Sequence, residues 1–116
     1  MPSSESRDLE RQYSALWCAV RRRRGTYLVN VYGELDLATV GDFDAALDRA
    51  FESGTPRIVI DLAELASIDS TGLRSLVLFN ERCEAAGREL AIRRGSRRVQ
   101  KAFEATSLEE RLPLES

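Results

Sequence analysis

The sequence predicts an α/β fold with a mixed β-sheet of four to five strands, about three helices and the element order β-β-α-β-α-β-α. Two runs rich in β-branched and aromatic residues stand near the start, separated by a polar tip that contains glycine. Apolar runs of strand length and amphipathic segments of helix length then alternate, joined by short loops. This alternation predicts parallel strands joined by right-handed crossovers, with the first strand antiparallel to its neighbour.

The first two elements are strands at residues 14–20 and 26–32. Four consecutive arginines and Gly25 lie between them, which predicts a hairpin. We interpret the arginine run as a solvated tip that also discourages edge-to-edge pairing of sheets. An anion-binding patch is the alternative.

A helix follows the turn at residues 33–39. Its predicted apolar face has helical spacing and consists of Val40, Phe43, Leu47, Ala50 and Phe51. Thr39 is the expected N-cap and Gly54 the expected stop. Asp36, in the turn, is interpreted locally as a turn or cap former.

The centre of the chain is a buried strand at residues 57–62, followed by a loop and a helix at residues 71–86 that ends at Gly87. Leu62, Leu65 and Ile68 are expected to pin the loop to the core. The cluster at residues 69–72 then forms a strand-to-helix turn, with Ser70 at the positive end of the helix.

The remaining elements are a strand at residues 89–93, a helix capped by Ser96, and a short extended end at residues 111–114. The helix at residues 71–86 is apolar over more than half its circumference, because Leu78 and Phe79 widen its apolar stripe. It is therefore either deeply packed or keeps surface for a partner.

Length and composition suit one domain. We expect residues 1–12 to be a mobile N-terminal tail and residues 13–116 to form the domain. A net charge of -2 argues against a nucleic-acid binder. No apolar run approaches the roughly 18 residues of a membrane span, and the N-terminus lacks a secretory signal, so no membrane association and a cytoplasmic location are expected.

The chain contains no histidine. A Ser-His-Asp hydrolase, a Cys-His protease and a His-ligated zinc site are therefore excluded within it. Its two cysteines, Cys18 and Cys83, are interpreted as buried, reduced thiols, with a redox pair as the alternative. No catalytic residue, metal or cofactor is predicted.

Ser70 has two interpretations. Taken alone, Ser70 and Thr71 are ordinary helix caps. A phosphate on Ser70 would in addition gain the free amides of the helix start and place nearly two negative charges beside Asp69. Phosphorylation would then act as a binding switch at nearly constant fold.

Four segments carry a family resemblance: residues 33–36 (Gly-Glu-Leu-Asp), 58–62 (Ile-Val-Ile-Asp-Leu), 68–73 (Ile-Asp-Ser-Thr-Gly-Leu) and 97–108. Together they resemble the STAS domain, named for sulphate transporters and anti-sigma factor antagonists. The resemblance covers nearly everything from Ser14 onward, so residues 13–116 are expected to be a single STAS domain. Arg74 and Ser107 depart from the pattern, because relatives often have glycine at each position.

The resemblance is to the free-standing bacterial anti-sigma factor antagonists. It implies that the unphosphorylated chain binds an anti-sigma factor serine kinase, which holds the ATP, and so releases a sigma factor. It also implies that phosphorylation at Ser70 ends the binding and that a metal-dependent phosphatase reverses the modification. The implied partner-binding residues are Asp36, Asp69, Ser70, Thr71, Gly72, Leu73 and Arg74.

Two other functions remain open from the sequence. One is a non-phosphorylated STAS accessory subunit of a lipid or solute transporter. The other is an enzyme with Ser70 as nucleophile, against which stand the missing histidine and the missing Gly-x-Ser-x-Gly elbow.

Overall fold

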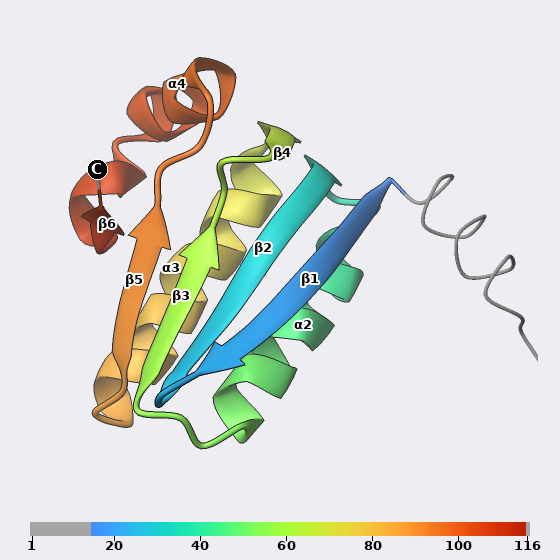
Figure 1. Ribbon diagram of the computed structural model, residues 1–116. Helices are drawn as coiled ribbons and strands as arrows, with labels where there is room; N and C mark the ends of the chain where they lie inside the picture. The colour runs from blue at the N-terminus through green and yellow to red at the C-terminus, as the bar shows by residue number, and fades with distance from the viewer. Residues whose placement is uncertain (1–14, 116) are drawn as a thin grey trace, which may run out of the picture.

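A computed structural model describes residues 15–115, so the predicted tail at residues 1–12 lies outside the described part. Figure 1 shows one twisted sheet with helices on one side. In chain order the elements are β1 (Leu16–Arg23), β2 (Thr26–Leu35), α2 (Val40–Glu52), β3 (Arg57–Asp61), β4 (Leu65–Ile68), α3 (Ser70–Ala85), β5 (Glu89–Arg93), α4 (Arg97–Thr106), the 3₁₀ helix η1 (Leu108–Arg111) and β6 (Leu114–Glu115).

The described sheet has six strands in the order β1-β2-β3-β5-β6, with β4 beside the end of β2. β1 runs antiparallel to β2, and every other pairing is parallel. The predicted α/β class, antiparallel first strand and parallel remainder are confirmed. The strand count exceeds the prediction because β4 and β6 are short strands of four and two residues, too short to show a periodic pattern.

The predicted hairpin is formed by β1 and β2. Its two-residue tip is Arg24-Gly25, and both residues have positive φ, +47° and +81°. Positive φ at both central positions is the conformation whose twist matches that of paired strands. Trp17 pairs with Tyr32 across the ladder, and their rings stack with centroids 5.2 Å apart.

Helices α2 and α3 lie behind the sheet in Figure 1, and α4 lies at its upper end. The central strand is buried on both faces, because Ile58, Val59 and Ile60 are all 0% exposed. The predicted pins Leu62, Leu65 and Ile68 are also buried, the last two within β4. The loop ahead of α3 is thereby fixed to the core.

Helix boundaries agree closely with the predicted ones. α2 and α3 end two residues before Gly54 and Gly87, each with positive φ. Ser96 caps α4 by accepting a hydrogen bond from the Val99 amide at 3.3 Å. Within residues 15–115, no helix is long and apolar enough to cross a bilayer.

Candidate functional site

The candidate site lies at the upper edge of the sheet in Figure 1, where β2 and β4 end side by side. Leu35 and Ile68 are register partners, so the residues that follow them, Asp36 and Asp69, leave the sheet at neighbouring positions. The Asp69 amide donates to the Leu35 carbonyl at 3.1 Å. Two segments distant in sequence thus form one corner.

Asp69, not Ser70, is the N-cap of α3. Its Oδ1 accepts hydrogen bonds from the amides of Thr71 at 2.9 Å and Gly72 at 3.2 Å. Its extended backbone, with φ -111° and ψ -174°, is the conformation that allows this reach. The interpretation of Ser70 and Thr71 as caps was therefore wrong, because the helix begins one residue earlier than predicted.

Ser70 is the first residue of α3 and is exposed. Its side chain has no bond to the helix start, since Asp69 occupies the amides of Thr71 and Gly72. In the unmodified protein Asp69 already holds those two amides, so a group added to Ser70 Oγ would have to displace this carboxylate in order to bind them. An added anion would still lie at the positive end of the helix dipole.

Asp36 organises the turn ahead of α2. Its Oδ1 accepts from the amides of Ala38 at 2.9 Å and Thr39 at 3.2 Å. Thr39 occupies the predicted N-cap position of α2 but makes no capping bond. Its hydroxyl points back instead, donating to the Glu34 carbonyl at 2.8 Å and accepting from the Asp36 amide at 3.0 Å. Asp36 is therefore the turn former that the sequence predicted.

Gly72 and Leu73 lie beneath the corner. Both are buried, and Leu73 is 0% exposed. A Cβ built on Gly72 would come 2.6 Å from Leu35 Cγ and 2.9 Å from Ile68 Cγ1. Glycine here lets the first turn of α3 pack directly on the ends of β2 and β4. These residues position the corner, and the exposed residues Ser70 and Arg74 form its surface.

Sequence reasoning missed one residue of this surface. Leu37, at the tip of the turn after Asp36, is 77% exposed. The available signal was its position, because an apolar residue between the turn former Asp36 and the start of α2 has no place on the apolar face of the helix. Leu78, which widens the apolar stripe of α3 in the sequence, is 52% exposed, so this part of the stripe is not packed in the core. It lines a hollow of about 340 Å³ between α2 and α3.

Neither thiol belongs to the corner. Cys18 on β1 and Cys83 on α3 are both free, as the leading interpretation predicted, but only Cys83 is fully buried and Cys18 is half-buried. Burial raises the pKa of Cys18 to about 11 and also raises the pKa of Cys83. Residues 15–115 contain no group of three or more His, Cys, Asp or Glu side chains that could hold a metal ion.

Several bacterial proteins resemble the chain in sequence, among them the following two. An anti-sigma-B factor antagonist of Staphylococcus aureus is 34% identical over 84 residues, which cover 72% of this chain and 78% of that protein. Osmosensory protein A of Mycobacterium tuberculosis is 35% identical over 65 residues, which cover 56% of this chain. The match spans only 40% of that longer protein.

Solved structures share the fold. An anti-sigma factor antagonist from Mycobacterium paratuberculosis superposes with a TM-score of 0.78 at 23% identity, over 85% of this chain and 84% of that one. The unphosphorylated anti-sigma factor antagonist SpoIIAA gives 0.69 at 22% identity, over 86% and 89% of the two chains. Phosphorylated SpoIIAA from Bacillus gives 0.63 at 20% identity, over 86% and 92%.

A family model described as "Mlab, STAS domain" matches residues 18–115, which include every described strand and helix except the first two residues of β1. The match contains the whole corner from Asp36 to Arg74. The chain belongs to the STAS domain family.

Proposed function

We propose that this protein is an anti-sigma factor antagonist switched by phosphorylation at Ser70. In its unphosphorylated form it binds an anti-sigma factor serine kinase through the corner formed by Asp36, Asp69, Ser70 and Arg74, and a sigma factor is released. The named relative in Staphylococcus aureus supports the antagonist function. The exposed hydroxyl of Ser70 on the first residue of α3 carries the proposal for the switch.

The chemistry requires only that the hydroxyl be accessible. The kinase transfers the γ-phosphoryl group of its ATP to Ser70 Oγ: a new O–P bond forms, the bond between the γ-phosphorus and the bridging oxygen breaks, and ADP leaves. The hydroxyl proton passes to a base on the kinase. A metal-dependent phosphatase hydrolyses the phosphoserine with water. The antagonist needs no cofactor in either step.

Phosphorylation would change the surface and leave the fold in place. The phosphate adds roughly 1.5 to 2 negative charges at pH 7, next to the Asp69 carboxylate. Because Asp69 keeps its hydrogen bonds to Thr71 and Gly72, the start of α3 remains capped. A kinase surface complementary to the unmodified corner would then meet excess negative charge and added bulk.

Intact-mass spectrometry tests the switch. The protein is first incubated with ATP, magnesium and the anti-sigma factor kinases of the organism that produces it. We expect one added phosphate, lost in Ser70→Ala. Ser75→Ala is the matched control, since Ser75 lies on the same helix and is half-buried, and it should still accept the phosphate. Ser70→Asp should no longer form the kinase complex, and an intact complex with that variant would contradict the switch.

Two further outcomes discriminate the alternatives. A complex without phosphate would indicate regulation by binding alone. Neither phosphate nor complex, together with co-purification of a transporter ATPase, would favour the transporter accessory subunit instead.

A further inference from the structure

A second charged surface begins at the hairpin tip, which is the end of β2 that lies far from the Ser70 corner. Four arginines, Arg21, Arg23, Arg24 and Arg93, line a hollow of about 370 Å³ together with Thr26 and Leu28. We call these four side chains the hairpin arginine surface. The ten residues of β2 separate its tip from the Ser70 corner, about 30 Å at roughly 3.3 Å per residue. The surface is therefore independent of the proposed switch site.

Strand alternation places this surface on the sheet face opposite α2 and α3. Arg21 pairs with Leu28 and Arg23 with Thr26, on the face that also carries the Trp17–Tyr32 stack. Arg22 points to the other face, with its guanidinium 5.6 Å from the Tyr27 ring centroid. Figure 1 shows both long helices behind the sheet and none in front of it.

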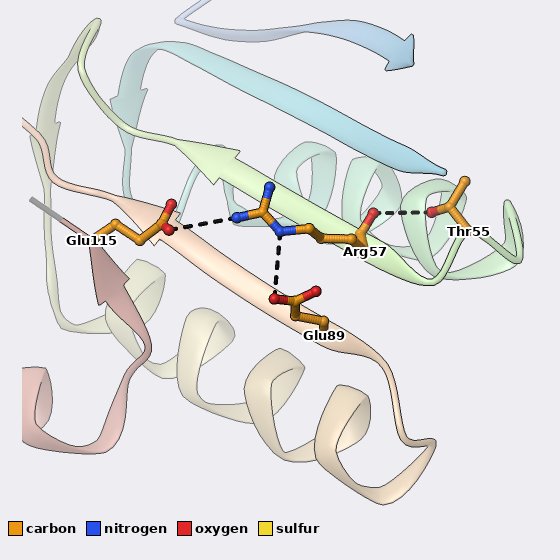
Figure 2. Close-up of polar contacts among 4 residues, drawn as sticks. All are labelled: Thr55, Arg57, Glu89 and Glu115. Atoms are coloured by element: carbon orange, nitrogen blue, oxygen red, sulfur yellow. Dashed lines mark hydrogen bonds and ion pairs between the residues drawn. The ribbon is translucent and has the colours of Figure 1, made fainter. Parts of the chain in front are cut away.

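The arginines of β3 and β5 on this face, Arg57 and Arg93, are paired with carboxylates, so within residues 15–115 Arg93 is the one member of the hairpin arginine surface that has an ion pair. Figure 2 shows Arg57 between two carboxylates, with Nη2 3.5 Å from Glu115 Oε2 and Nε 3.6 Å from Glu89 Oε1. Arg93 lies 3.5 Å from Asp61. Among residues 15–115, by contrast, Arg21, Arg23 and Arg24 have no ion pair. The positive charge is therefore concentrated on the hairpin side of the face.

The residue choice at the tip supports a role for this charge. Arg24 has φ +47°, a conformation that asparagine, aspartate and glycine adopt more readily. An arginine here carries a conformational cost that turn formation alone does not explain. Backbone strain retained at a charged, exposed position is typical of sites that serve a function.

We propose that the hairpin arginine surface binds an extended acidic segment of a partner protein. Charge complementarity favours an anionic partner. The arginines are exposed and spread over β1, the hairpin turn and β5, so they suit many weak contacts along a chain better than one small anion in a closed site. A nucleic acid fits less well, because Glu89 and Glu115 lie on the same face and the whole chain has a net charge of -2.

The test uses a glutamate-rich peptide of about ten residues, long enough when extended to cross the surface. Trp17, the only tryptophan in the sequence, lies on the same face six residues along β1 from Arg23, so its fluorescence reports whether the bound peptide extends along β1. Fluorescence anisotropy of the labelled peptide gives an independent affinity. We expect saturable binding that weakens as salt is raised, and none to a glutamine peptide of equal length.

The chain provides a matched pair of variants. Arg23→Glu and Arg22→Glu make the same charge change at adjacent positions on opposite faces of β1. We expect Arg23→Glu to weaken peptide binding about fivefold and Arg22→Glu to weaken it less than about twofold. Thermal unfolding of both variants, compared with the parent protein, checks that each is folded.

Several results would overturn the proposal. Equal losses in the two variants would mean that only net charge matters. Tighter binding of an RNA oligomer, or equal binding of pyrophosphate, would assign the surface to a different ligand, and no binding at all would leave the arginines as solvated side chains without a partner. Arg23→Glu should still be phosphorylated at Ser70. Loss of that phosphorylation in Arg23→Glu would place the arginines in the kinase interface. If the parent protein and both variants are all unphosphorylated, the result contradicts the proposed switch at Ser70 and does not bear on the arginine surface.

Discussion

Asp69 combines two roles that a pair of substitutions can separate. Its carboxylate caps α3 through the amides of Thr71 and Gly72, and it also supplies charge beside Ser70. Asp69→Ala removes the cap and should lower the free energy of unfolding by about 1 kcal/mol. Asp69→Asn retains a capping oxygen and should cost only a few tenths of a kcal/mol. Urea denaturation of both variants measures the difference.

The same pair tests the interface. If the charge of Asp69 contacts the kinase, Asp69→Asn should weaken the complex even though α3 remains capped. Equal stability losses in the two variants would show that the cap depends on charge and not on geometry.

Arg74 lies one helical turn after Ser70, the spacing at which side chains on a helix meet. It is exposed and has no ion pair among the residues that the structure describes. A cation at this position favours the dianionic form of a phosphate on Ser70 and lowers its second pKa. Arg74→Gln should therefore raise the phosphoserine pKa, as measured by phosphorus NMR titration of the phosphorylated protein. An unchanged titration would exclude contact between the two groups.

At the scale of single residues, the sequence located the corner but misassigned its cap. The run Asp-Ser-Thr-Gly contains three possible capping residues in succession, and composition cannot decide which of them begins the helix. The pairing of Leu35 with Ile68 decides it, because that contact fixes where the backbone leaves the sheet. The exposure of Leu37 could not be predicted for a related reason. Whether its side chain faces solvent depends on the direction of the turn after Asp36, which is also set by the folded structure.

Among the elements, α3 depends on a glycine that accepts no side chain. Gly72→Ala would force a Cβ within 3.0 Å of Leu35 and Ile68, both buried. Overpacking of this kind should lower the free energy of unfolding by about 1 to 3 kcal/mol. Gly41→Ala in α2 is the matched control, because a Cβ there meets nothing within 4 Å. That substitution should stabilise the protein by about 0.5 to 1 kcal/mol.

Thermal or urea unfolding of the two alanine variants gives the comparison directly. The same sign of change in both would mean that helix propensity, and not packing at the corner, controls these positions.

Strands β3 and β5 and the α-helices α2, α3 and α4 could be predicted because each carries its own periodic pattern. Strand β4 could not be predicted, since the sequence indicates only that Leu65 and Ile68 hold the loop before α3 against the core. Its strand character comes from pairing with β2 beyond a register shift at Gly33. Gly33 has φ +97°, and a Cβ on it would lie 2.1 Å from the Ala15 carbonyl oxygen. This arrangement depends on contact between distant segments and leaves no local signal.

For the molecule as a whole, the half-buried thiol of Cys18 predicts how stability depends on pH. Burial raises the pKa of Cys18 from 9.0 to about 11 in the folded state. Below pH 9 both the folded and the unfolded chain keep this thiol protonated, so it has no effect. Between pH 9 and about 11 the unfolded chain releases the proton and the folded chain retains it, so rising pH favours unfolding.

The loss of stability attributable to Cys18 should approach about 2 to 3 kcal/mol across this window, at about 1.4 kcal/mol per pK unit. Urea denaturation at a series of pH values, with Cys18→Ala as the reference, isolates the contribution because other titrating groups are common to both proteins. The parent protein should lose stability more steeply than the variant above pH 9. Parallel curves would mean that Cys18 is accessible to hydroxide in the native state. That result would fit the half-buried position of Cys18 in the hollow between β1 and α2, which it lines with Asp42 and Arg49.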